Sequence, residues 1–275
     1  MRFLRRYWLD AVALTVAIVV FVVPFGFIFL TAVKDRAQSA ALDLSWPTSW
    51  HVRENLTEVF TARNNMLQTA TRNSLFVTIA SVTIVVIACS MVGFVLERRR
   101  DRMSKVVNAF VLSGLIIPPA VVPTIYVLQE INLFNTLWGL ILVEVAFTAP
   151  FAIILFRAFV ATIPRELDEA AMIDGCTSFT LYRRVVFPLL RPVIITVIVT
   201  ASVAIYNDFV NPLYFLPGSD NPTVQLTLYN FQSQFNTRWN LLFMDVLLIT
   251  IPPLIMFILF NRKIVAGLTA GAIKG

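Results

Sequence analysis

Long apolar runs are the feature that most constrains this chain. The segments 11–33, 74–96 and 106–128 contain no charged residue. Three further apolar runs, at about 137–156, 192–208 and 241–260, each contain a single carboxylate. A helix needs about 20 apolar residues to cross the roughly 30 Å hydrocarbon layer of a membrane. The pattern therefore predicts six transmembrane helices.

The composition supports the same class of protein. Only 14% of the residues are charged, 58% are hydrophobic, and the mean hydropathy is +0.78. Soluble domains carry about 25% charged residues. We therefore expect an all-α integral membrane protein with one polytopic domain over 1–275. The spans would be joined by external loops at about 34–73 and 209–240 and by a loop at about 157–191.

The arginines and lysines predict the orientation. The N-terminus, the 97–105 connection, the 157–191 loop and the tail together hold 16 of the 22 basic residues. By the positive-inside rule, both termini and the 157–191 loop are expected in the cytoplasm. This bias also accounts for the net charge of +6, so nucleic-acid binding is not expected. The first run is longer than a usual signal-peptide core, which favours a retained span over cleavage near Ala37.

Catalytic and metal-binding patterns are not found in the sequence. The single histidine, His51, has no potential ligand set near it, and Cys89 and Cys176 fit neither a disulfide nor a metal site. The glycines of 267–275 lack the spacing of a phosphate-binding loop. Few ionisable residues fall within the spans, which argues against a proton relay. We expect no catalytic residue, metal or cofactor on this chain.

A polar segment, ELDEAAMIDG at 166–175, interrupts the apolar runs. Pro164 and the acidic residues favour the start of a helix, because proline suits the first turn and carboxylates stabilise the positive end of the helix dipole. Leu167, Ala170 and Ala171 fall on one face of this helix. Gly175 is suited to end it in a left-handed conformation. We expect the alanines to be exposed, where another backbone can approach closely.

A second short helix is expected to follow directly. Thr177 or Ser178 can cap its start. Phe179, Tyr182 and Val186 form its apolar stripe, until a proline interferes. Two short helices at a sharp angle favour a docking element for a partner protein. A helix that lies along the membrane surface is the alternative.

This segment resembles the EAA motif of bacterial ABC-importer permeases. The matching positions are Glu169-Ala170-Ala171, Gly175 and Phe187-Pro188, with phenylalanine where leucine is more usual. The tail at 267–275, GLTAGAIKG, resembles that of the second, maltose-permease-like subunit of carbohydrate-uptake importers. Asn73-Ser74 at the start of the second span is also similar. The resemblance covers nearly the whole chain.

The resemblance implies the permease subunit of a type I-like ABC importer for a sugar or oligosaccharide, in a bacterial cell membrane. The implied partners are a sister permease, two ATPase subunits that carry ATP and magnesium, an extracytoplasmic sugar-binding protein, the sugar and membrane lipid. The helix at 164–174 would be the coupling helix, seated in an ATPase groove. A tail that runs towards the ATPases is also implied, with a disordered end as the alternative. The implied ATPase-contacting residues are Glu169, Ala170, Ala171, Asp174, Gly175 and Pro188 in the loop and Gly267, Gly271, Lys274 and Gly275 in the tail.

Polar residues in the last three spans are candidates for the transport pathway. Carboxylates within spans usually face the interior of the bundle or a water-filled cavity. The family is commonly rich in tryptophan and asparagine around 206–209, a pattern from which this chain departs. Packing within the bundle and contact with the sister subunit are the alternatives to a direct sugar contact. The candidates are Glu144, Tyr206, Asn207, Asp208 and Asp245.

Three competing interpretations of the whole chain are a permease for a different small solute, a stand-alone secondary carrier and a non-transporting scaffold. The GLTAGAIKG ending argues against the first. A carrier would transport without an ATPase, and a scaffold would not support uptake at all.

Overall fold

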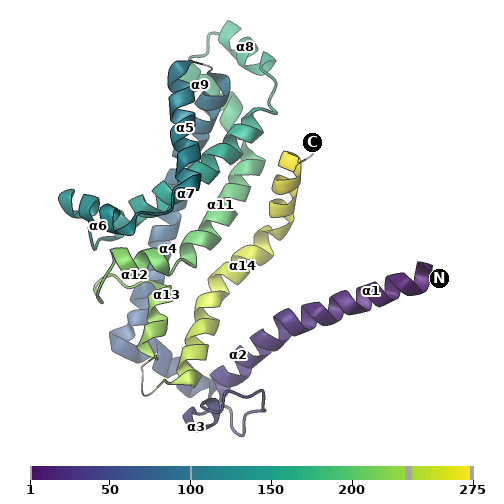
Figure 1. Cartoon of the computed structure of the whole chain (residues 1–275), viewed down its shortest axis with the longest axis vertical. Coiled ribbons are helices and arrows are strands. Elements are labelled where there is room, and N and C mark those ends of the chain that lie inside the picture. The colour runs from purple at the N-terminus through teal and green to yellow at the C-terminus, as the bar shows by residue number, and fades with distance from the viewer. Residues whose placement is uncertain (1, 100, 233–236, 273–275) are drawn as a thin grey trace. The chain divides into compact units, whose positions relative to one another are not determined.

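The computed structural model describes residues 2–99, 101–232 and 237–272, with side chains at 8, 10–99, 101–232 and 237–260. Every regular element in these ranges is helical (Figure 1), which confirms the all-α class. The elements are α1 (Arg2–Ala17), η1 (Ile18–Val22), α2 (Val23–Val33), α3 (Arg36–Ser39), α4 (Val52–Arg98), α5 (Arg102–Ile116), α6 (Val121–Glu130), α7 (Leu137–Val160), α8 (Glu166–Ile173), α9 (Ser178–Leu181), η2 (Tyr182–Val186), α10 (Phe187–Leu189), α11 (Arg191–Tyr206), α12 (Val210–Phe215), α13 (Val224–Thr227), η3 (Leu228–Asn230) and α14 (Trp239–Ala272).

Several of these helices can cross a membrane. Within the described residues, four segments are long and apolar enough: Asp10–Val33, Val52–Arg98, Leu137–Val160 and Trp239–Phe260. A fifth is obtained if Ser178–Leu189 and Arg191–Tyr206, which meet at a bend of 75°, count as one broken span. The chain is therefore a multi-pass membrane protein. The six-span count stays a prediction.

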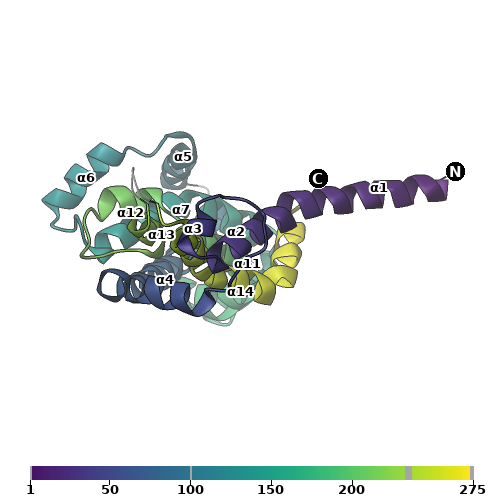
Figure 2. The same cartoon turned by 90° about the horizontal axis from the view of Figure 1, so that it is seen from below.

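The segment expected as the third span, 106–128, is divided between two helices. α5 ends at Ile116, the backbone is extended at Ile117 (ψ 123°), and α6 starts at Val121. Figure 2 shows α5 and α6 running in different directions. Pro118 and Pro119 explain the break, because proline lacks the N–H that a helix needs and disfavours helical backbone in the residue before it.

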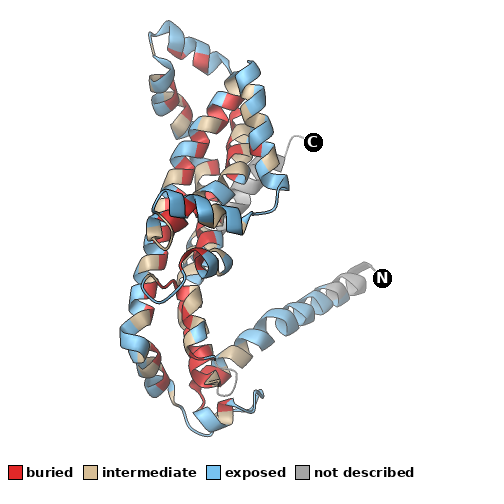
Figure 3. Cartoon of the chain, turned by 60° about the vertical axis from the view of Figure 1, so that its left-hand side comes forward, coloured by how far each residue is buried: buried red, intermediate tan, exposed pale blue. Residues whose placement is uncertain are grey.

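The chain forms two compact units, of which one contains Met1–Thr71 and Thr223–Pro252. In this unit, side chains from Asp10 to Phe25 are exposed along α1, η1 and the start of α2 (Figure 3). Further along α2, the ring of Phe27 meets that of Phe243 edge-on at 5.4 Å between centroids. The first part of α4 is interrupted at 62–65, where three residues have positive φ.

A buried lysine organises the segment after α2. The Lys34 ammonium is fully buried and donates to the Asp43 carboxylate at 2.8 Å and to the Ser45 hydroxyl at 3.1 Å. The Asn55 amide donates to the carbonyls of Ala32 and Lys34 and accepts from Asn240. The hydrogen bond from Lys34 lowers the pKa of Asp43 to about 2. These bonds connect the end of α2 with residues 43, 45 and 55.

The second unit contains Arg72–Pro222 and Pro253–Gly275. Its apolar core is built from α4, α7, the 157–191 loop and α11, with Val85, Phe156 and Val186 fully buried. α4 and α7 approach each other closely at Gly93. A Cβ there would lie 2.8 Å from the Cβ of Phe156 and 3.0 Å from the backbone nitrogen of Arg157, so only glycine fits.

Candidate functional site

The 157–191 loop forms the first candidate site, and α8 is its outermost helix. Three acidic residues occupy the first turn of α8, as the sequence suggests. The helix ends in a Schellman motif: the Cys176 N–H donates to the Ala171 carbonyl and the Gly175 N–H to the Met172 carbonyl, both at 3.0 Å. Gly175 has φ +79°, and no neighbouring atom lies within 4 Å of the place that a Cβ would occupy. The expected left-handed end of this helix is confirmed.

The inward face of α8 differs from the expected one. Asp168 and Ala171 are buried, whereas Leu167 and Ala170 are exposed. The prediction that both alanines lie on the exposed face is therefore wrong for Ala171. The cause is an ion pair, because the Asp168 carboxylate lies 2.6 Å from the Arg98 guanidinium and turns this side of α8 towards the end of α4.

The last residues of α4 fasten the whole loop. Arg98 also donates to the Ile163 carbonyl at 3.1 Å, just before α8. Its neighbour Glu97 pairs with Arg157 at 3.0 Å and accepts, through its carbonyl, a bond from Arg165 at 3.3 Å. The loop is thus tied to α4 at several places between Arg157 and Asp168.

The second arm of the loop is anchored by a tyrosine. Thr177 caps α9, as expected, by accepting from the Thr180 N–H. Tyr182 is buried, its hydroxyl lies 2.7 Å from that of Ser90, and its ring packs against Phe94. Phe179, which the sequence places on the same stripe, is exposed.

The helix passes Pro188 by widening, where the sequence suggested an ending. η2, with one extra residue per turn, spans Tyr182–Val186 directly before the proline. A wide turn of this kind absorbs a proline because it relieves the clash and the missing N–H. The sharp bend comes two residues later, at Leu190, before α11 begins.

The tip of the loop is an exposed apolar and acidic surface. Met172 and Leu167 are exposed, and Ile173 is 87% exposed. Of the other candidate residues, Glu169, Asp174, Gly175 and Pro188 are also exposed. Clustered exposed apolar side chains mark interaction sites. The geometry of the loop therefore suits docking to a partner.

The second candidate site is a carboxylate cluster in the unit that contains α7. Glu144 is buried on α7, and the Asn211 amide donates to it at 3.2 Å. Asp208 accepts from the backbone N–H groups of Val210 and Asn211, and so caps α12. Its carboxyl group is close enough to interact with Glu144. The structure thus brings Glu144 and Asp208 together, and it adds Asn211, which was not among the residues expected from the sequence.

The remaining pathway candidates lie elsewhere. Tyr206 is buried, and the Asn207 amide donates to the Val203 carbonyl of its own helix. Asp245 belongs to the other compact unit, where it is fully buried and accepts from the Thr227 hydroxyl at 2.8 Å. The described residues contain no cluster of three or more potential metal ligands.

The tail is described in part. Gly267 and Gly271 belong to the helical backbone of α14, which continues to Ala272. Lys274 and Gly275 lie outside the described residues.

Comparisons with known proteins give a consistent picture. The family model of the binding-protein-dependent transport system inner membrane component matches residues 86–266, a range that includes the 157–191 loop. The chain is 30% identical to the diacetylchitobiose uptake system permease protein DasC of Streptomyces coelicolor, over 98% of each chain. It is 28% identical to the probable starch degradation products transport system permease protein AmyC of Thermoanaerobacterium thermosulfurigenes, over 98% of this chain and 97% of that protein.

Solved structures share the fold. A chain of a bacterial ABC transporter involved in the import of the acidic polysaccharide alginate superposes with a TM-score of 0.81 at 19% identity, covering 95% of this chain and 98% of that one. A chain of the alginate transporter in complex with its pentasaccharide-bound periplasmic protein gives a TM-score of 0.69 at 16% identity, with 95% of each chain covered. The family model matches more than half of this chain, and the chain therefore belongs to the family of binding-protein-dependent transport system inner membrane components.

Proposed function

We propose that the chain is the permease subunit of an ATP-driven importer for a sugar or oligosaccharide. Family membership is the observation that carries this proposal. Two of its relatives are named as permeases for diacetylchitobiose and for starch degradation products, which supports carbohydrate as the substrate class. An extracytoplasmic binding protein would deliver the carbohydrate, and a sister permease would complete the pathway.

In this proposal, the tip of the 157–191 loop docks on an ATPase. Leu167, Met172 and Ile173 provide apolar contacts, and Glu169 provides charge at the start of α8. The small side chain of Ala170 lets the partner approach the helix closely. Both termini and the loop would face the cytoplasm, and the tail from Gly267 to Gly275 would contact the two ATPases.

Movement of the docked helix would reach the spans through two contacts. The Arg98–Asp168 ion pair connects α8 with α4, and the Ser90–Tyr182 hydrogen bond connects α4 with the second arm of the loop. When ATP binding closes the ATPase dimer, the loop would move as a lever and shift the spans between inward-facing and outward-facing states.

This subunit would carry out no chemical reaction of its own. ATP and magnesium would bind to the two ATPase subunits. Its own task would be to transmit movement and to line the pathway.

The cluster of Glu144, Asp208 and Asn211 is the part of the proposed pathway with the best polar geometry. Carboxylate and amide groups can form hydrogen bonds with the hydroxyl groups of a carbohydrate, and carboxylates within a span usually face a cavity or a partner. Packing between α7 and α12 is the alternative role, since Asn211 already joins these two helices.

Reconstitution tests the proposal. The chain, its sister permease, the ATPases and the binding protein would be placed in proteoliposomes, with the carbohydrate identified beforehand by calorimetry on the binding protein. We expect uptake that requires both ATP and the binding protein. Uptake without the ATPases would indicate a secondary carrier. A binding protein specific for a solute other than a carbohydrate would contradict the substrate class while leaving the importer mechanism intact.

A further inference from the structure

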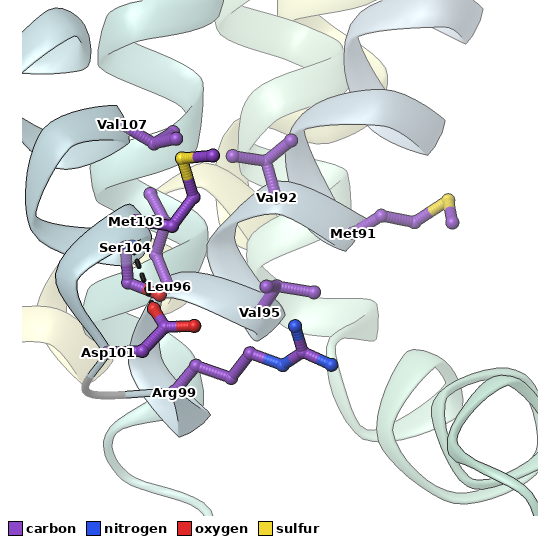
Figure 4. Close-up of a pocket in the computed structure, with 9 residues that line it drawn as sticks. All are labelled: Met91, Val92, Val95, Leu96, Arg99, Asp101, Met103, Ser104 and Val107. Atoms are coloured by element: carbon purple, nitrogen blue, oxygen red, sulfur yellow. Dashed lines mark hydrogen bonds between the residues drawn. The ribbon is translucent and has the colours of Figure 1, made fainter.

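A groove lies between the end of α4 and the start of α5 (Figure 4). Its volume is about 260 Å³. In Figure 4, Met103 of α5 and Val92 of α4 point towards each other across it, and Arg99 and Asp101 lie at the end where the two helices are connected. Its apolar lining consists of Met91, Val92, Val95, Leu96, Met103 and Val107.

A polar pocket of about 370 Å³ adjoins this groove and shares Leu96, Arg99 and Ser104 with it. Lys105 and Arg157 also line the polar pocket. Arg157 is already committed, since it donates to Glu97 and to Asn108.

Two cations of this pocket remain available. Within the part of the chain that the structure describes, the Arg99 guanidinium and the Lys105 ammonium have no hydrogen-bond or ion-pair partner, and both residues are exposed. Asp101 does not neutralise them by contact: its carboxylate accepts from Ser104 at 2.8 Å and caps α5. Hydrogen bonding from Ser104, first from its side chain and then from its backbone N–H, lowers the pKa of Asp101.

The site lies where the chain passes from apolar to charged sequence. Ile87, Met91 and Val95 are exposed along α4, and charged residues begin at Glu97. Such a boundary falls at the headgroup level of a bilayer, where basic residues between membrane helices attract acidic lipid headgroups.

We infer that the groove and the adjoining pocket bind one anionic phospholipid. Its phosphate lies between Arg99 and Lys105, and one acyl chain runs along the groove past Val95 and Met103. The charge of the pocket selects an anion, because its two free groups are cations. The apolar groove selects a lipid over a free phosphate, since a phosphate ion could not use it.

Native mass spectrometry and lipid titration on the assembled transporter test this inference. The probes are phosphatidylglycerol, phosphatidylcholine, glycerol phosphate and inorganic phosphate. We expect saturable binding of phosphatidylglycerol, which Arg99→Gln and Lys105→Gln each weaken by about fivefold. The matched control is Arg102→Gln, which removes a neighbouring charge on α5 that lines neither pocket.

Each other outcome would contradict the inference. An equal loss with Arg102→Gln would indicate attraction by general charge. If phosphatidylcholine binds equally well, the site does not select for an anionic headgroup. If glycerol phosphate or inorganic phosphate binds tightly, the apolar groove does not contribute to binding. Lipid that binds the isolated chain and not the assembled transporter would mean that a partner subunit covers the groove.

Discussion

The Nε atom of Arg98 lies 2.6 Å from a carboxylate oxygen of Asp168, and the two side chains are only 13% and 10% exposed. This ion pair joins the end of a membrane helix to the helix proposed to dock on the ATPase. Removing one partner of a buried pair is costly, because the other charge is left without compensation.

Asp168→Asn is therefore expected to loosen α8 by about 3 kcal/mol and to lower ATP-driven uptake without reducing membrane insertion. Hydrogen exchange over 164–174 and uptake in proteoliposomes measure the two effects. The control is Glu166→Gln, which removes an exposed acid from the same turn. A double variant that exchanges the two charges, Arg98→Asp with Asp168→Arg, should restore part of the uptake. A normal uptake and exchange pattern in Asp168→Asn would show that the pair does not position the loop.

Gly175→Ala is expected to weaken coupling through strain alone. The left-handed backbone at φ +79° costs a side chain about 1–2 kcal/mol, and no neighbouring atom adds a clash. Gly218→Ala is the matched control, since Gly218 also has a positive φ (+100°) and open space around it, but lies outside the 157–191 loop. We expect the ratio of sugar transported to ATP hydrolysed to fall in the first variant only. An equal fall in both would point to general destabilisation.

Glu169→Lys tests the docking surface directly. The residue is exposed, so the fold should be kept while the charge that meets the ATPase is reversed. Co-purification of the ATPase and ATP-driven uptake should both decrease. Glu130→Lys, at the exposed end of α6, gives the same charge change away from the loop and should have no effect. Full coupling in Glu169→Lys would argue against this surface.

Cysteine labelling checks the expected orientation. After Cys89 and Cys176 are replaced by serine, a cysteine at Thr177 should react only from the cytoplasmic side. Cysteines at Ser49 and Ser219 should react only from outside, and all three positions are exposed. Reaction of the Thr177 variant with an impermeant reagent in intact cells would contradict the expected topology. It would place the loop outside the cell, where it could not contact a cytoplasmic ATPase.

The segment around Lys34 is expected to be sensitive to acid. The pKa of Asp43 is depressed to about 2, so its contribution is present above the ordinary value of 3.8 and is lost as the pH falls towards 2. Hydrogen exchange over 34–55 should therefore accelerate between about pH 4 and pH 2. Asp43→Asn should show fast exchange already at neutral pH, whereas Asp220→Asn, an exposed acid, should behave as the parent protein. Slow exchange in Asp43→Asn would mean that the ion pair is dispensable.

The fold class and the position of the loop could be predicted because both depend on local patterns. Apolar runs, the acidic first turn and Gly175 predict helices and their ends without knowledge of distant contacts. The face of α8 could not be predicted in this way. It depends on Arg98, which lies 70 positions before Asp168 in the chain. From the sequence alone, Arg98 indicated only the orientation of the chain in the membrane.

The carboxylate cluster was also predictable only in part. Glu144 and Asp208 are visible as charges in apolar runs, but only the folded chain shows that Asn211 lies against Glu144. The break at Pro118-Pro119 was open to prediction from the two prolines. The uniform hydropathy of 106–128 concealed it.

The close approach at Gly93 has a consequence for how the permease can move. With the backbone of α4 pressed against Phe156 and Arg157, the two helices cannot slide past each other without a clash. We therefore expect the part of α4 after Arg72 to move together with α7 as one rigid body. If the chain transports as proposed, we expect the helices to bend at the breaks outside this contact, at the extended turn at Ile117 and at the 75° bend at Leu190.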